Sequence, residues 1–259
     1  MKIVVCVKEV PDSAAKMAVE DKDVSWGDAP LVLNPWDEYA VESALQISEK
    51  HSGDVTVITV GKEGSNEALK TALAMGCNQA VLISDPSLSN VDSQAVAQIL
   101  AAAIQRIGDV DLVFFGRQAI DGDMGVTSAQ SARILGFPML SHVSVIKNVD
   151  VDSKKISVDR TTEEGRQSVE SGFPSVLSVS KDIGEPRYPS FMGIRKASRA
   201  QIPVWSLSDL GLETPNSFVK WPDIQVPPAR EITTEMIEGD SPQDIAEKLA
   251  DKIMGEKVL

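Results

Sequence analysis

The sequence predicts an α/β protein with a mostly parallel sheet, antiparallel strands at its edge and an extended C-terminal arm. Short apolar runs alternate with amphipathic helical segments in the first half of the chain. Shorter strand-like segments follow residue 136, and prolines recur after residue 184. With 259 residues, the chain is long enough for one large core and an appendage.

The parallel strands are predicted from four apolar runs, as expected of strands that helices cover on both faces. They are Lys2–Val7, Asp54–Val60, Ala80–Ser84 and Asp111–Phe115. Strands and helices that alternate in this way form right-handed crossovers. Ligands of such sheets bind at the carboxyl ends of the strands, near a switch in strand order. The loops after Val7, Val60 and Phe115 are therefore the first places to look for a site.

Three helices separate these strands. The first is expected to start with Asn34 as its N-cap and Pro35 at its first position, with acidic residues in the next turn. The second ends before Gly76, a plausible C-cap, and the third spans residues 93–107. Since each helix has an apolar face, all three are predicted to pack on the sheet.

The second half of the chain has a different pattern. Four short strands, predicted to be antiparallel, could extend the sheet edge: Val143–Ile146, Ile156–Arg160, Gln167–Ser171 and Val176–Val179. Beyond Gly184 an extended arm is expected. It ends in a helix with Ser241 as N-cap and an apolar stripe of Ile245, Leu249 and Ile253. A helix at the end of an arm needs a surface to pack on, which a partner subunit or the chain's own domain could offer.

Composition makes several classes of function improbable. The net charge of −13 disfavours binding to nucleic acids and anionic membranes. No apolar run approaches the roughly 18 residues that span a bilayer, and the N-terminus does not read as a signal peptide, so a cytoplasmic location is expected. Two distant cysteines and two isolated histidines give no metal-ligand spacing, so no metal site is predicted.

The most informative segment runs from Gly116 to Gly136. It leaves an apolar strand, passes three glycines and enters a helix near Thr127. Free backbone N–H groups at such a turn suit a phosphate, although an ordinary strand-to-helix connection explains the glycines equally well. Asp121 and Asp123 would repel a phosphate unless they cap helices or face away. The segment has neither the Walker pattern nor the usual dinucleotide fingerprint.

Six segments together resemble the electron-transfer flavoprotein β family. They are MKIVVCVKEVPD, LNPWDEYAVESAL, TALAMGCNQAV, LVFFGRQAIDGD, VDRTTEEGR and FPSVLSVSKDIGEPRYPSFMGIRKA. The likeness covers roughly Met1 to Gly211, in order. It implies a Rossmann-like domain over residues 1–190 that binds an adenine nucleotide. Residues 191–259 would be a recognition loop and an arm, with its terminal helix, that packs on an α subunit.

The resemblance implies an electron carrier rather than an enzyme. With its α subunit, the chain would form a heterodimer that takes electrons from flavin-dependent dehydrogenases, such as the acyl-CoA dehydrogenases of fatty acid oxidation. It would pass them to a quinone oxidoreductase or a similar acceptor. FAD, held by or shared with the α subunit, would carry out the redox chemistry, and AMP would lie in the β subunit.

The resemblance also implies which residues bind these groups. AMP contacts would come from Cys6, Asn34, Pro35, Trp36, Asp37, Val60, Gly116, Arg117, Gln118, Ala119, Ile120, Asp121, Gly122, Asp123, Met124, Gly125, Val126 and Thr127. Candidates on the flavin side are Ser13, Trp36 and Arg160. Partner recognition would involve Arg187, Tyr188, Phe191, Met192 and Ile194, with Phe191 as the apolar anchor. Purely structural roles stay open: Trp36 in the core, Arg160 in an ion pair, Phe191 packed on its own domain.

Three alternatives are weighed against this interpretation. A bifurcating relative would hold a second FAD in place of AMP; Met124 and Ser128 fit neither branch well, and we favour AMP. A stand-alone nucleotide sensor would lack the proline-rich arm. An adenylating enzyme would need a pyrophosphate loop after the first strand, where this chain has KEVPDS.

Overall fold

The computed structural model describes residues 1–20, 23–88, 91–229 and 234–256. The chain divides into two units, Met1–Ile224 and Gln225–Leu259. Within the described residues of the first unit, nine strands form one sheet, in the order β11-β10-β9-β12-β8-β1-β6-β7-β13. Helices lie on both faces of this sheet, so the predicted α/β class is confirmed. None of the described helices is long and apolar enough to cross a bilayer.

The parallel strands lie at the centre of the sheet. β1 (Lys2–Cys6) pairs with β6 (Asp54–Val60) on one side and with β8 (Leu112–Gly116) on the other. From β6 the sheet continues to β7 (Gln79–Ile83). The chain therefore builds outward from β1 to β7 and then returns to the other side of β1. This reversal is the switch in strand order where a parallel sheet offers a crevice.

The antiparallel strands form one edge. β9 (Met139–Asp150), β10 (Lys155–Thr162) and β11 (Gly165–Gly172) form a meander, as predicted. For the fourth predicted strand, Val176–Val179, the antiparallel direction is wrong. β12 (Ser175–Val179) runs parallel to both β8 and β9 and is buried along its whole length. Its apolar sequence suits a strand covered on both faces rather than an edge strand.

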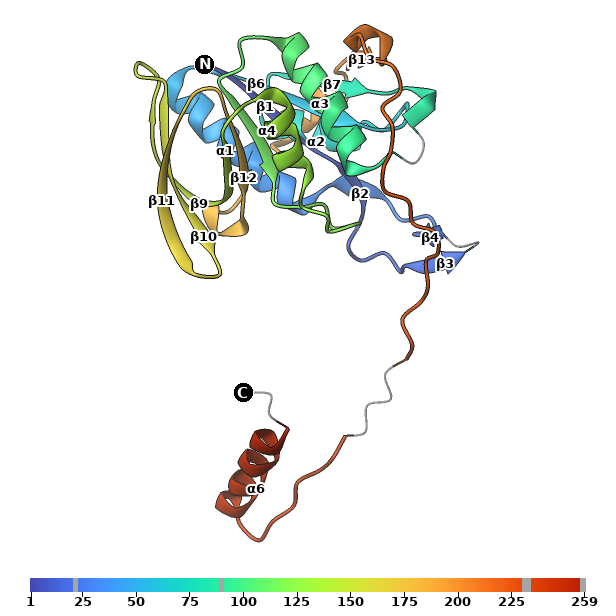
Figure 1. Ribbon diagram of the computed structural model, residues 1–259, viewed down its shortest axis with the longest axis vertical. Helices are drawn as coiled ribbons and strands as arrows, with labels where there is room; N and C mark the ends of the chain where they lie inside the picture. Colours follow the sequence, from blue (N-terminus) through green and yellow to red (C-terminus); the bar gives the residue numbers. More distant parts are fainter. Residues whose placement is uncertain (21–22, 89–90, 230–233, 257–259) are drawn as a thin grey trace. The chain divides into compact units, whose positions relative to one another are not determined.

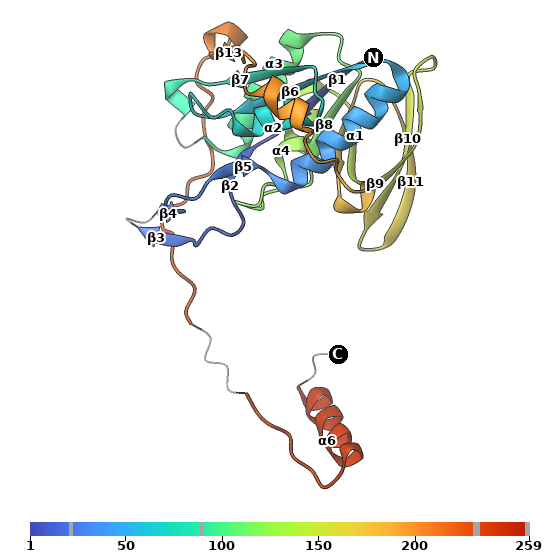
Figure 2. The ribbon, with the colours of Figure 1, turned by 180° about the vertical axis from the view of Figure 1, so that it is seen from behind.

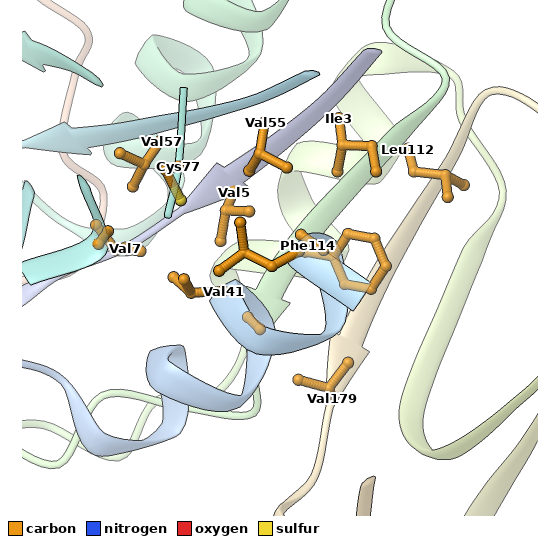
Figure 3. Close-up of a cluster of buried hydrophobic side chains, with 14 of the residues drawn as sticks. Ile3, Val5, Val7, Val41, Val55, Val57, Cys77, Leu112, Phe114 and Val179 are labelled. Carbon is orange, nitrogen blue, oxygen red and sulfur yellow. The ribbon is translucent and has the colours of Figure 1, made fainter. Parts of the chain in front are cut away.

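Two hydrophobic clusters lie on opposite faces of the sheet. Along β1, Ile3, Val5 and Val7 point into the first cluster, whereas Val4 and Cys6 point into the second. The first cluster includes α1 (Pro35–His51) and α2 (Glu67–Met75), seen from behind in Figure 2, and Figure 3 shows its side chains around Phe114. The second includes α3 (Ser93–Ile107) and α4 (Thr127–Leu135), which lie side by side in Figure 1.

Several small elements escaped prediction. β2 (Glu9–Pro11) pairs with β5 (Leu31–Leu33), and β3 (Ala18–Glu20) pairs with β4 (Asp23–Ser25). Short 3₁₀ turns occur at Pro86–Leu88, Lys181–Ile183 and Ser208–Leu210. Each of these strands and turns is only three residues long, too short for a periodic sequence signal.

Within residues 185–210, the chain is more ordered than an extended arm. α5 (Phe191–Ala197) packs on α2, and β13 (Val204–Trp205) adds to the sheet beside β7. The structure therefore places residues 191–224 in the first unit. That residues 191–259 pack on an α subunit stays a prediction.

The second unit contains the predicted terminal helix, α6 (Pro242–Gly255). The Ser241 Oγ accepts the Asp244 N–H at 3.2 Å, which confirms Ser241 as the N-cap, and Pro242 follows it. The predicted stripe of Ile245, Leu249 and Ile253 is partly exposed. Within this unit Lys248 pairs with Asp244 one turn earlier, and Lys252 pairs with Glu235.

Candidate functional site

A cavity of about 360 Å³ opens where the carboxyl ends of β1, β6 and β8 meet. Cys6 and Val7 come from β1 and its end, Val60 from β6, and Phe115 and Gly116 from β8. The loop 116–125 and the first residues of α3 and α4 complete much of the lining. The cavity therefore lies at the switch in strand order, where the sequence predicted a ligand site.

The start of α1 presses directly on the end of β8. A Cβ placed on Gly116 would lie 2.6 Å from the Trp36 carbonyl carbon and oxygen, and closer still to the Asp37 carboxylate. Real Cβ atoms do not approach other atoms so closely, so position 116 requires glycine. The Asp37 carboxylate accepts the Lys8 N–H at 2.7 Å and the Gly116 N–H. It thus joins the ends of β1 and β8 at the cavity, which Asp37 also lines.

Asn34 has a different role from the predicted side-chain cap. It occupies the N-cap position of α1, but its side chain makes no capping bond there. Instead its Nδ2 donates to the Gln118 carbonyl at 2.9 Å, and its Oδ1 accepts the Ile120 N–H at 3.2 Å. The fully buried amide thereby holds the middle of the glycine-rich loop.

The two loop carboxylates, which sequence reasoning counted against a phosphate site, each have a partner. Asp121 forms an ion pair with Lys8, with 2.6 Å between Oδ2 and Nζ. Asp123 accepts the Gln118 Nε2–H at 2.9 Å and adopts a left-handed backbone with φ +47°. Lys8 also lines the cavity, so the end of β1 brings a cation to the acids of the loop.

The first turn of α4 is open to the cavity. Its N-cap residue, Val126, makes no side-chain capping bond, so Thr127 and Ser128 do not act as the N-cap. Gly125, with φ +62°, turns the loop into the helix. Gly125, Thr127 and Ser128 all line the cavity. Uncapped N–H groups at a helix start attract an anion.

Most of the predicted nucleotide residues meet at this cavity. Thirteen line it: Cys6, Asp37, Val60, Gly116, Arg117, Gln118, Ala119, Asp121, Gly122, Asp123, Met124, Gly125 and Thr127. The other five support the loop or lie beside it rather than line the cavity: Asn34, Pro35, Trp36, Ile120 and Val126. That these residues bind a nucleotide stays a prediction.

Sequence reasoning missed one side of the cavity. Its additional lining residues are Val7, Lys8, Val91, Asp92, Ser93, Val96, Leu100, Phe115, Ser128, Val219 and Trp221. Asp92 precedes Ser93 at the start of α3, a readable N-cap that faces the end of the sheet. Val219 and Trp221 have no such local signal, because only tertiary contacts bring them to the cavity.

Burial changes the titration of two cavity groups. It raises the pKa of Asp37 from 3.8 to about 7, although hydrogen bonds from the Lys8 and Gly116 N–H groups oppose the shift. Burial, and then the charge of Asp37, raise the pKa of the Cys6 thiol well above its usual value. Cys6 is therefore an uncharged thiol at neutral pH, suited to packing rather than to nucleophilic chemistry.

The predicted flavin-side residues are divided between two places. Ser13 lies on an exposed turn after β2. Arg160 lies in β10 opposite Val143, and its buried Nε has no hydrogen-bond partner among the described residues. Burial, then Arg117 and Arg160, lower the pKa of His142, so both guanidinium groups lie near this histidine. Arg117 also lies over the Trp36 ring, 5.7 Å from its centre.

The predicted recognition residues form an exposed apolar surface. The exposed fractions are 94% for Tyr188, 80% for Phe191, 69% for Met192 and 53% for Ile194. Phe191 thus does not pack on its own domain. Arg187 is different, because its guanidinium donates to Glu42 and Glu49 of α1 at 2.5–3.2 Å. It fixes the base of this segment rather than standing free for a partner.

The surface rests on a close helix–helix contact. Ser190 Oγ accepts the Gly193 N–H at 2.9 Å and caps α5. A Cβ on Gly193 would meet the Ala74 carbonyl group of α2, with the carbonyl carbon 3.1 Å away. Glycine at this position therefore lets α5 lie against α2.

Comparison with known proteins agrees with the family resemblance seen in the sequence. Residues 27–210 match the family model described as "Electron transfer flavoprotein domain". The chain is 38% identical to the electron transfer flavoprotein subunit beta of Mycobacterium leprae, over 82% of this chain and 81% of that protein. It is 32% identical to the subunit of the same name from Megasphaera elsdenii, over the full length of both. It is also 35% identical, over the full length of both, to the caffeyl-CoA reductase-Etf complex subunit CarD of Acetobacterium woodii.

Proposed function

The chain belongs to the electron transfer flavoprotein family as a β subunit, and we propose that its cavity binds AMP while an α subunit supplies the flavin. The observation that carries this proposal is the cavity at the switch in strand order, lined by thirteen of the predicted nucleotide residues. The open start of α4 suits the phosphate, and Lys8, which is paired with Asp121, lines the same cavity.

We favour AMP over a second FAD as the ligand of this cavity. Ligand pockets span roughly 300–1,000 Å³, and about 360 Å³ is close to the lower limit, which suits a mononucleotide. The ion pair with Lys8 offsets the negative charge of Asp121, and the hydrogen bond from Gln118 fixes the position of Asp123. Sequence identity does not distinguish an AMP-binding chain from a bifurcating one. An electron transfer flavoprotein β subunit and a reductase-complex subunit match this chain about equally well.

Calorimetry on nucleotide-depleted complex tests the choice of ligand. The chain, purified with its α subunit and one FAD, is titrated with AMP and separately with FAD. AMP should bind with one site per chain, and FAD should not fill that site. Stoichiometric uptake of a second FAD in preference to AMP would move the protein to the bifurcating branch.

The flavin face would be built from residues around Trp36. FAD supplies the redox chemistry, and the chain supplies one wall. The buried Nε of Arg160 has no hydrogen-bond partner in the described part of the chain, and both Arg160 and Arg117 lie within electrostatic reach of His142. Such positive groups would favour the electron-rich form of a nearby flavin. Ser13, on its exposed turn, is the other candidate on this side.

The recognition surface, defined as Tyr188, Phe191, Met192 and Ile194, would dock on a flavin-dependent dehydrogenase. An exposed aromatic anchor on a rigid element loses little entropy on binding. α5 is fixed on α2 and Arg187 is fixed on α1, so these side chains are presented in a set position. In the same proposal, the electrons pass on to a quinone oxidoreductase, and the C-terminal arm packs on the α subunit. The protein would be a cytoplasmic electron carrier without an enzymatic activity of its own.

Electron transfer tests the carrier role. The heterodimer is mixed with a reduced acyl-CoA dehydrogenase, and flavin reduction in the heterodimer is followed by its absorbance. Reduction that saturates with dehydrogenase concentration is expected. A heterodimer that binds FAD but accepts no electrons from such dehydrogenases would exclude this donor class.

A further inference from the structure

Residues 217–221, here called the strap, are fixed at the edge of the cavity by one side chain. The Asp92 carboxylate accepts the N–H groups of Phe218 and Val219 at 2.6 and 3.0 Å. In return, the Asp92 N–H donates to Ser217 Oγ at 3.0 Å. These bonds join segments separated by more than 120 positions, so a specific tertiary contact sets the position of the strap.

The same carboxylate caps α3. Its Oδ1 accepts the Ala95 N–H at 2.9 Å, and the hydrogen bonds from Ala95 and then from Val219 and Phe218 lower the pKa of Asp92. The carboxylate is therefore ionised at neutral pH and already engaged by both segments. Its bonds are used for positioning, which leaves ligand contacts to the neighbouring side chains.

Two residues of the strap, Val219 and Trp221, line the cavity. Val91, Val96 and Leu100, from the start of α3 and the residues before it, line the cavity too. Because Asp92 joins the strap to the start of α3, these apolar groups form one side of the site. Lys8, after β1, and Asp121, in the glycine-rich loop, form their ion pair elsewhere in the lining.

We propose that the strap is a wall of the nucleotide site and that Trp221 contacts the aromatic base of the bound adenylate. This inference rests on the proposed binding of AMP. Trp221 lines the cavity and is 71% exposed in the protein alone, so its indole is available to a ligand. A planar base placed against an exposed indole removes apolar surface from water and gains stacking energy. The phosphate then lies toward the start of α4.

Two strap variants test this assignment. Trp221→Ala removes the proposed contact and leaves Asp92 and its bonds unchanged. Phe218→Ala is the matched control, because Phe218 is also 71% exposed and lies in the same strap, but is not a lining residue of the cavity. Both variants are purified with the α subunit, depleted of nucleotide and titrated with AMP. Circular dichroism checks that each variant is folded.

Trp221→Ala should weaken AMP binding about tenfold or more, which corresponds to the loss of one base–aromatic contact. Phe218→Ala should bind as the wild type does, and Trp221→Phe, which keeps a ring, should recover most of the affinity. Equal affinities for the wild type, Trp221→Ala and Phe218→Ala would overturn the role of the strap and leave the AMP site intact. A wild-type complex that binds no AMP at all would refute the proposed function itself.

Discussion

The backbone of Gly116 lies against the carbonyl group of Trp36, so that a Cβ at position 116 would lie 2.6 Å from the Trp36 oxygen. This contact brings the start of α1 to the end of β8. It thereby places Asp37 between the ends of β1 and β8, where its carboxylate accepts N–H groups from both. This junction at the cavity therefore requires a residue without a side chain at position 116.

Gly116→Ala should therefore destabilise the protein. The added methyl group has to displace backbone atoms of α1, and overpacking of this kind costs about 3 kcal/mol. Urea denaturation of the complex measures the loss. Gly122→Ala is the control in the same loop, since a Cβ there meets nothing within 4 Å; it should change the unfolding free energy by less than about 0.5 kcal/mol. Equal stabilities for the two variants would contradict the close contact.

Asp37 predicts a specific dependence of stability on pH. Because folding raises its pKa from 3.8 to about 7, the native state binds this proton more tightly than the unfolded state does. Its contribution to the unfolding free energy therefore falls as the pH rises through this range and is constant above it. Asp37→Asn cannot titrate. The variant should thus gain stability relative to the wild type from pH 3.8 to about 7. A difference that does not change with pH would disprove the shift.

Arg187→Ala should loosen the base of the recognition surface. The change leaves Glu42, which is 7% exposed, without its charged partner, whereas the second partner, Glu49, is more exposed. We expect a loss of about 1–2 kcal/mol in unfolding free energy, and faster hydrogen exchange in α5. Lys155→Ala is the control because it breaks a solvent-exposed pair with Glu170, and pairs of this kind contribute little to stability. Exchange in α5 unaffected by Arg187→Ala would rule out this anchoring role.

Phe191→Ala should reduce electron uptake from the dehydrogenase without affecting the fold. Removing a central aromatic anchor costs about 2 kcal/mol of binding, so the apparent second-order rate of flavin reduction should fall by about thirtyfold. The limiting rate at saturating dehydrogenase should change much less. Phe218→Ala, another exposed phenylalanine, should leave both rates unchanged. A fall in both variants alike would indicate a general effect of surface hydrophobicity.

Local signals made much of the fold predictable. The apolar runs of β1, β6 and β8 are continuous, and Pro35 and Ser241 mark helix starts by their own chemistry. β12 was assigned the wrong direction because its short apolar run fits either a parallel or an antiparallel strand. Only its neighbours, β8 and β9, decide between the two.

The candidate site was predictable where loop and helix start are adjacent in the chain, as from Gly116 to Thr127. The contacts of the Asn34 side chain could not be predicted from the sequence. Its position at the N-cap was readable, but its side chain bonds Gln118 and Ile120, more than 80 residues away. Trp221 lines the cavity beside the bonds of Asp92 to Phe218 and Val219, and no local pattern records such a long-range contact.

The nucleotides carried by the complex as it comes from the cell give the most direct test. The heterodimer is purified, denatured and freed of protein, and the released nucleotides are separated and counted against protein concentration. One AMP and one FAD per heterodimer are predicted. Two FADs without AMP, or one FAD with no other nucleotide and no uptake of added AMP, would contradict an adenylate site at the end of β8.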